Sequence, residues 1–255
     1  MKLELQSSLF DEEYPEYSIN KPIRLIELFA GYGSQSMAMN RINADFESYK
    51  AVEFDYHACN LFNAAHNTNF PVTDITKIHA DDLEIVDRDK FEYIMFYSFP
   101  CQSLSLAGKQ AGMHKGDGTR SGLLWEVERL LLELDAQNHN LPQVLIMENV
   151  SQVHSVKNMP DFQEWINALN RLGYSSYYED LNAKNYGIPQ NRERTFMVSI
   201  LGEYDFTFPE PIPLKYCMVD ILEKEVDEKF FLNSERVDNL IKQLIVEKKI
   251  PEIKE

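Results

Sequence analysis

A cysteine directly after a proline stands at the end of a short apolar segment. Residues 93–97 are aromatic and apolar, which is typical of a buried strand. Pro100 ends this strand because proline has no N–H to donate to a strand ladder. Cys101 follows at once, where a thiol held on a turn could act as a nucleophile. Most free cysteines are small buried hydrophobes, and this stretch alone favours that alternative.

A glycine turn and a later acid indicate a nucleotide-like ligand. Residues 23–29 predict a strand, which leads into a turn with Gly31 and Gly33 and then into a helix. This order begins a Rossmann-like unit, whose glycines let the backbone approach a ligand. Glu53 comes twenty residues after Gly33, at the end of a second predicted strand over 49–54, and could accept hydrogen bonds from a ribose diol. A simple tight turn and a solvated surface acid are the alternatives.

Three more sets of polar side chains lie at the ends of predicted elements. Asp74 could bind an adenine amino group or simply cap a turn. Glu148 follows a buried strand over 144–147, where function and solvation are equally good interpretations. Arg192 and Arg194 alternate before another strand and therefore share one face, although a solvated sheet edge often has the same pattern.

The elements that must position these groups alternate between strands and helices. Apolar residues at helical spacing predict helices over 36–42, 55–65, 121–134 with Ser121 as N-cap, 162–172 and 233–247. Further strands are predicted over 174–181 and 195–201. We divide the chain into a polar leader over 1–21, a catalytic domain over 22–205, and a proline-rich connector with a helical tail over 206–255.

Composition excludes several classes of protein. The three cysteines have no paired spacing, so we expect neither a disulfide framework nor a zinc knuckle, and an intracellular compartment. No apolar run is long enough to span a membrane. The net charge of −16 argues against nucleic acid, but Lys109, Lys115 and Arg120 form a local basic region that is compatible with DNA.

Together these motifs resemble those of the DNA cytosine-C5 methyltransferases, in the family's order and at similar spacings, over about residues 22–202. The restriction-modification enzymes of bacteria and phages are the most similar members. The matching segments are Phe29-Ala30-Gly31-Tyr32-Gly33, Glu53, Asp74-Ile75-Thr76, Phe99-Pro100-Cys101-Gln102-Ser103, Gly122-Leu123-Leu124, Glu148-Asn149-Val150 and Gln190-x-Arg192-x-Arg194.

The resemblance implies an α/β fold of the Rossmann-like S-adenosylmethionine-dependent type, with a mostly parallel twisted sheet and helices on both faces. It implies that Cys101 adds to C6 of a flipped cytosine, which activates C5 for methylation. It further implies that Glu148 bonds N3 and the exocyclic amine, and that Arg192 and Arg194 hold the base carbonyl, a phosphate or the Glu148 carboxylate.

The implied cofactor is S-adenosylmethionine, with S-adenosylhomocysteine as product and no metal. The implied partner is double-stranded DNA, and the implied location is the cytoplasm of a bacterial or phage-infected cell. By resemblance, the residues that bind the cofactor are Phe29, Ala30, Gly31, Gly33, Glu53, Phe54, Asp74, Ile75, Pro100 and Leu124. The basic loop over 101–120 is expected to close over the base and to contact phosphates.

The chain departs from the family where the target-recognition domain and a later asparagine-based cofactor motif are expected. We therefore expect both to be absent, and a second polypeptide to be an alternative source of the recognition domain. An inactive or split-enzyme fragment that binds cofactor or partner remains an alternative, as does an RNA cytosine-C5 methyltransferase. A Rossmann dehydrogenase is disfavoured because it would leave Cys101, Glu148 and the arginine pair without a role.

Overall fold

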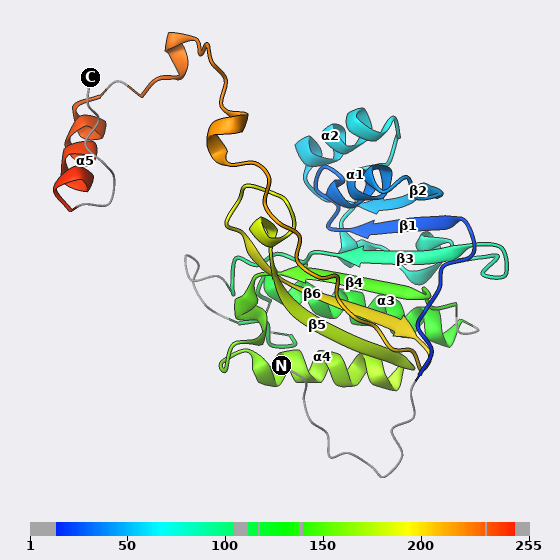
Figure 1. The fold of residues 1–255 in the computed structure, drawn as a ribbon. Coiled ribbons are helices and arrows are strands. Elements are labelled where there is room, and N and C mark those ends of the chain that lie inside the picture. Colours follow the sequence, from blue (N-terminus) through cyan, green and yellow to red (C-terminus); the bar gives the residue numbers. More distant parts are fainter. Residues whose placement is uncertain (1–13, 105–111, 117, 138–139, 233, 248–255) are drawn as a thin grey trace.

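The computed structural model describes residues 14–104, 112–116, 118–137, 140–232 and 234–247 of the 255-residue chain. A six-stranded sheet in the order β2-β1-β3-β4-β6-β5 organises the molecule (Figure 1). Its strands are β1 (Ile23–Leu28), β2 (Phe46–Val52), β3 (Glu92–Tyr97), β4 (Val144–Asn149), β5 (Tyr174–Asn182) and β6 (Glu193–Leu201). The pairs β1/β2, β1/β3 and β3/β4 are parallel, whereas β6 runs antiparallel to β4 and β5.

Helices cover both faces of this sheet, which confirms the predicted α/β fold class. They are α1 (Ser34–Arg41), α2 (Tyr56–His66), α3 (Leu124–Ala136) and α4 (Met159–Arg171), whereas α5 (Glu235–Val246) does not cover the sheet. The apolar sides of α3 and α4 pack on one face, where Leu130 and Trp165 are fully buried. Met39 of α1 packs on the opposite face with Leu25 and Ile94. Burial of these side chains supplies most of the stabilisation of the sheet.

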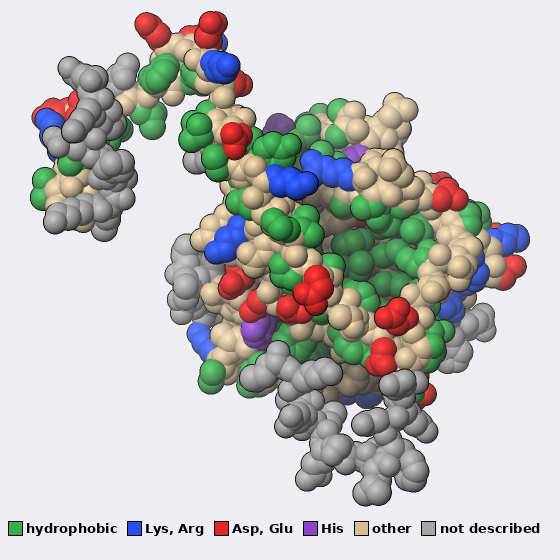
Figure 2. Space-filling view, viewed as in Figure 1, with side chains coloured by type: hydrophobic (Ala, Val, Ile, Leu, Met, Phe, Trp, Pro, Cys, Tyr) green, Lys and Arg blue, Asp and Glu red, His purple; other side chains and the backbone are tan. Residues whose placement is uncertain are grey.

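The second face is covered in part by chain segments without regular structure. Tyr17, Phe206 and Phe208 pack against its core, and the rings of Tyr17 and Tyr204 meet edge-on at 4.9 Å. Figure 2 shows apolar side chains gathered in a hollow on this face. Parts of the predicted leader and of the proline-rich connector therefore lie against the sheet, while α5 stands apart from the body (Figure 1).

Two local predictions were wrong. The second strand begins at Phe46 and ends at Val52, so Glu53 and Phe54 lie just beyond it; the half-exposed start of this edge strand hid its beginning in the sequence. Ser121 is not a helix N-cap, since it lies in a 3₁₀ turn and its hydroxyl bonds elsewhere. Among the described residues, no helix has both the length and the apolar character needed to cross a membrane.

Candidate active site

The predicted site residues meet at one edge of the sheet. Leu28 of β1 lies opposite Val52 of β2 and Tyr97 of β3, so three parallel strands end side by side. Tyr97 in turn lies opposite Met147 of β4. The antiparallel strand β6 begins at the same edge, because its Thr195 lies opposite Asn149. The carboxyl ends of parallel strands are where open α/β sheets bind ligands.

The glycine turn, residues 29–33, joins β1 to α1 in a conformation that few residues adopt. Phe29 and Gly31 both have φ of 57°, and Gly33 has φ of 83°. A Cβ atom on Gly33 would lie 2.3 Å from His66 Nε2, so α2 packs too closely for a side chain there. A Cβ on Gly31 would meet no atom within 4 Å, which leaves its backbone open to a ligand.

Glu53 is held against this turn. Its Oε2 accepts a hydrogen bond from Gly31 N–H at 2.9 Å, and its Oε1 accepts one from Asp55 N–H at 2.8 Å. Phe54, the next residue, is 65% exposed and offers an apolar ring beside the carboxylate. An open glycine backbone, a fixed carboxylate and an exposed ring together fit the ribose and adenine of a nucleoside cofactor.

A buried carboxylate that the sequence did not reveal links the two elements on either side of the glycine turn. Glu27 of β1 is 1% exposed, and its carboxylate accepts hydrogen bonds from Ser36 Oγ at 2.5 Å and from Ser36 N–H at 3.3 Å. Burial raises the pKa of Glu27 above its ordinary value, against the lowering effect of the Ser36 bonds. Glu27 thereby ties the strand before the turn to the first turn of α1.

Asp74 and Ile75 differ in what they present to a ligand. The exposed carboxylate of Asp74 accepts hydrogen bonds from Thr76 N–H and Thr76 Oγ1, which lower the pKa of Asp74 and keep it ionised. Ile75 is 4% exposed and packs in the core. Leu124 is likewise buried, with no exposed surface, so these two apolar residues back the site rather than line it openly.

The nucleophile turn, residues 99–103, is held by two buried polar side chains from later in the chain. Asn149 Nδ2 donates to the carbonyl of Phe99 at 2.9 Å. Ser121 Oγ donates to the carbonyl of Pro100 at 2.7 Å and accepts from Ser103 N–H at 3.3 Å. Cys101 itself is partly exposed at the edge of the core. The turn therefore presents the thiol at the surface on a fixed backbone.

Both predicted arginines form ion pairs with Glu148. Its Oε1 lies 3.1 Å from Arg194 Nε and 3.6 Å from Arg192 Nη2. The Arg194 and Glu148 side chains are about equally exposed, at 23% and 22%, so the pair is partly shielded from water. Two guanidinium groups on one oxygen of the carboxylate fix its orientation, and the second oxygen can accept a hydrogen bond from a ligand.

The start of β6 is braced by a network that the sequence did not indicate. Thr195 is fully buried, and its hydroxyl donates to Asp180 Oδ1 of β5 at 2.5 Å. His154 Nε2 lies 3.0 Å from the same oxygen. Because Thr195 directly follows Arg194, this network helps to keep the arginine beside Glu148.

The basic loop is only partly described. Lys109 lies outside the described residues. Lys115 pairs with Glu128 and lies 5.0 Å from the centre of the Trp125 ring. Arg120 donates to Gln102 Oε1 at 2.7 Å. In this structure these two cations contact protein groups, so contacts with phosphates remain a prediction.

Known proteins of one family match this chain over most of its length. The family model of C-5 cytosine-specific DNA methylases matches residues 23–253. Type II methyltransferase M2.ScrFI of Lactococcus lactis subsp. cremoris is 33% identical over 85% of this chain and 72% of its own length. Orphan methyltransferase M.SssI of Spiroplasma monobiae is 32% identical over 89% of this chain and 70% of its own length.

Solved structures show the same fold. The S. pombe Dnmt2 methyltransferase superposes with a TM-score of 0.66 at 21% identity, over 87% of this chain and 66% of that one. The Entamoeba histolytica methyltransferase EhMeth gives a TM-score of 0.68 at 18% identity, over 90% of this chain and 66% of that one. The chain therefore belongs to the C-5 cytosine-specific DNA methylases, which transfer a methyl group from S-adenosylmethionine to C5 of cytosine in DNA.

Proposed function

We propose that Cys101 is the nucleophile of this reaction and that Glu148, Arg192 and Arg194 are its catalytic partners. The hydrogen bond from Asn149 to the Phe99 carbonyl, at 2.9 Å, is the observation that carries the proposal. It joins the backbone two residues before Cys101 to the residue directly after Glu148. The thiol and the carboxylate thus share one rigid edge, as a base held between them requires.

The Cys101 sulfur adds to C6 of a cytosine that has left the duplex. The electron pair of the C5–C6 double bond shifts to the C4–C5 bond, and the pair of the C4–N3 double bond moves onto N3, which takes up a proton, so that C5 becomes the nucleophilic carbon of an enamine. Glu148 accepts a hydrogen bond from the exocyclic amine and shares a proton with N3, which offsets the charge that develops on the ring. Arg194 holds this carboxylate in place, with Arg192 beside it.

S-Adenosylmethionine, when bound, supplies the electrophilic methyl group that C5 accepts. We assign Glu53 to the ribose hydroxyls, Phe54 to the adenine ring and Asp74 to the adenine amino group. Phe29, Ala30, Gly31 and Gly33 supply the turn that approaches the cofactor, and Pro100, Ile75 and Leu124 form its apolar surroundings. Loss of the C5 proton to water and cleavage of the sulfur–C6 bond then restore the aromatic ring and the Cys101 thiolate.

The test compares C101S with C217S in methyl transfer from labelled S-adenosylmethionine to duplex DNA. Cys217 is an exposed thiol outside the site and serves as the matched control. We expect C101S to lose about a thousandfold or more in rate and C217S to match the wild type. Equal rates for C101S and the wild type contradict the proposal, and faster methylation of tRNA than of DNA would reassign the substrate to RNA.

We propose further that the C-terminal tail, from residue 219 onward, binds the domain that reads the DNA sequence, and that a second polypeptide carries this domain. Several large apolar side chains there are exposed, among them Val219 at 73%, Phe230 at 69% and Leu232 at 78%. Figure 2 shows such side chains along the outstretched tail. Replacing Phe230 and Leu232 by serine should reduce DNA methylation but leave the affinity for S-adenosylmethionine unchanged; unchanged methylation contradicts this assignment.

A further inference from the structure

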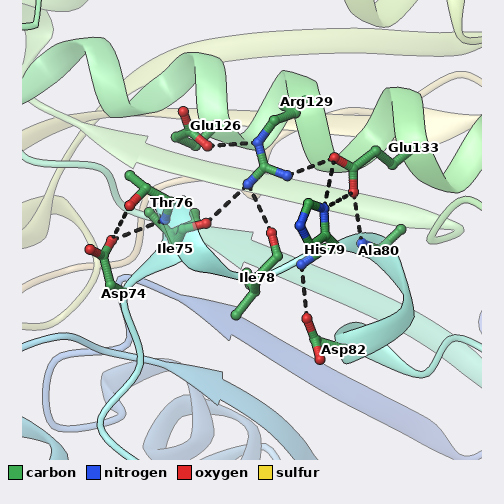
Figure 3. Close-up of polar contacts among 10 residues, drawn as sticks. All are labelled: Asp74, Ile75, Thr76, Ile78, His79, Ala80, Asp82, Glu126, Arg129 and Glu133. Atoms are coloured by element: carbon green, nitrogen blue, oxygen red, sulfur yellow. Dashed lines mark hydrogen bonds and ion pairs between the residues drawn. The ribbon is translucent and has the colours of Figure 1, made fainter.

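One arginine of α3 binds a segment that the proposed cofactor site uses. Figure 3 shows Arg129 reaching from the helix to the segment over 74–80, which contains the 3₁₀ turn Ile75–Lys77. Its Nη2 donates to the carbonyl of Ile75 at 3.1 Å and to the carbonyl of Ile78 at 3.0 Å. A single guanidinium group thereby satisfies two backbone acceptors, which lie on either side of Thr76 and Lys77.

Two glutamates of the same helix bind the guanidinium group, and one of them also binds the segment. Arg129 Nε donates to Glu126 Oε2 and its Nη1 to Glu133 Oε1, both at 2.7 Å. Glu133 Oε2 also accepts a bond from Ala80 N–H at 2.9 Å (Figure 3). The glutamates lie one turn before and after Arg129, so helix geometry sets all three groups in line along the segment.

The hydrogen bonds from Ala80, Arg129 and His79 also favour the ionised form of Glu133. Burial raises the pKa of this carboxyl, but these bonds outweigh it, and the net pKa lies below the ordinary value. Thr73, just before the segment, donates its N–H to the carbonyl of Glu53 at 2.7 Å, and Glu53 in turn accepts from Gly31 N–H of the glycine turn. Arg129 and Glu133, which we call the clamp, are therefore connected through the 74–80 segment to Asp74 and Glu53.

We propose that Arg129 is a positioning residue for S-adenosylmethionine, which sets Asp74 at the adenine by fixing the 74–80 segment to α3. This inference rests on the proposed role of Asp74 and adds the groups that hold it there. Arg129 touches backbone carbonyls and not the cofactor, so its effect passes through the position of the segment. A lysine cannot replace the planar fork that reaches four acceptors at once.

The experiment measures the Kd for S-adenosylmethionine by calorimetry in R129M, R129K, E133Q and R171M. Arg171 is exposed at the end of α4 and serves as the matched control. We expect Kd to rise about tenfold in R129M, somewhat less in R129K and E133Q, and not at all in R171M. Amide hydrogen exchange of residues 74–80 should quicken in R129M, which a loss of general stability alone would not confine to that segment.

A second readout separates this inference from the proposed function. Exchange of the cytosine C5 hydrogen in DNA without cofactor reports thiol addition and should be the same in R129M and the wild type. Wild-type Kd in folded R129M and E133Q overturns the clamp alone. A wild-type chain that binds no S-adenosylmethionine overturns the proposed cofactor site instead. If R129M does not fold, R129K and E133Q decide the matter by the same measurements.

Discussion

The glycine turn and the nucleophile turn end neighbouring strands, yet they are stabilised in different ways. The glycine turn is held by nearby residues, since Glu27 bonds Ser36 nine positions later and Glu53 bonds Gly31 at a separation of 22. The nucleophile turn also depends on a residue much farther along the chain, because Asn149 bonds Phe99 at a separation of 50, in addition to Ser121, which bonds Pro100 at a separation of 21. The cofactor half can thus form from one local unit, whereas the thiol is positioned only when β3, β4 and the 3₁₀ turn before α3 have assembled.

This difference predicts that the two turns can be damaged separately. Replacing Glu53 by alanine removes the acceptor for Gly31 N–H and, under the proposed assignment, for the ribose hydroxyls; hydrogen bonds to a charged acceptor contribute about 1.5–3 kcal/mol each. We expect the Kd for S-adenosylmethionine to rise about tenfold to a hundredfold. Cofactor-free exchange of the cytosine C5 hydrogen should be unchanged, and E47A is the control, because Glu47 lies on β2, the strand that leads to Glu53, with its side chain 61% exposed.

A loss of C5 hydrogen exchange in E53A as large as the loss in cofactor affinity would show that the two turns act as one unit. The comparison between them would then fail.

Ser121 offers the reverse test with a smaller effect. S121A removes the donor to the Pro100 carbonyl, and one such bond contributes about 1 kcal/mol. We expect C5 hydrogen exchange to fall about fivefold while the Kd for S-adenosylmethionine stays constant. Ser234, the exposed cap of α5, provides the control S234A. Unchanged exchange in S121A would mean that Asn149 alone holds the turn.

Sequence patterns revealed the glycine turn, Glu53 and the Pro100-Cys101 pair because each depends on short-range spacing. The supports from Asn149, Ser121 and Arg129 could not be found in this way. The spacing of Glu126, Arg129 and Glu133 is ordinary for a solvated helix surface, and only the packing of α3 beside residues 74–80 gives Arg129 its carbonyl partners. The role of Thr195 could not be predicted either, because its partner Asp180 lies on the neighbouring strand.

The smallest predicted effect concerns pH and the glycine turn. Burial raises the folded-state pKa of Glu27, so the folded chain binds this proton more tightly than the unfolded chain does. The stability that Glu27 contributes is therefore fully present below the unfolded pKa of about 4.5 and is lost as the pH rises through the folded pKa.

E27Q keeps the size of the side chain and removes this titration. The free energy of unfolding of E27Q, relative to the wild type, should therefore increase as the pH rises above about 4.5, as urea denaturation at several pH values would measure. A difference that stays constant with pH would mean that Glu27 does not titrate in this range.

The most direct test of the central claim is C5 hydrogen exchange in duplex DNA without S-adenosylmethionine, comparing the wild type, C101S and C217S. We predict exchange in the wild type and in C217S, and none above background in C101S, because only the thiol on the nucleophile turn can add to C6. Exchange in C101S at the wild-type rate would contradict the assignment of Cys101 as the nucleophile.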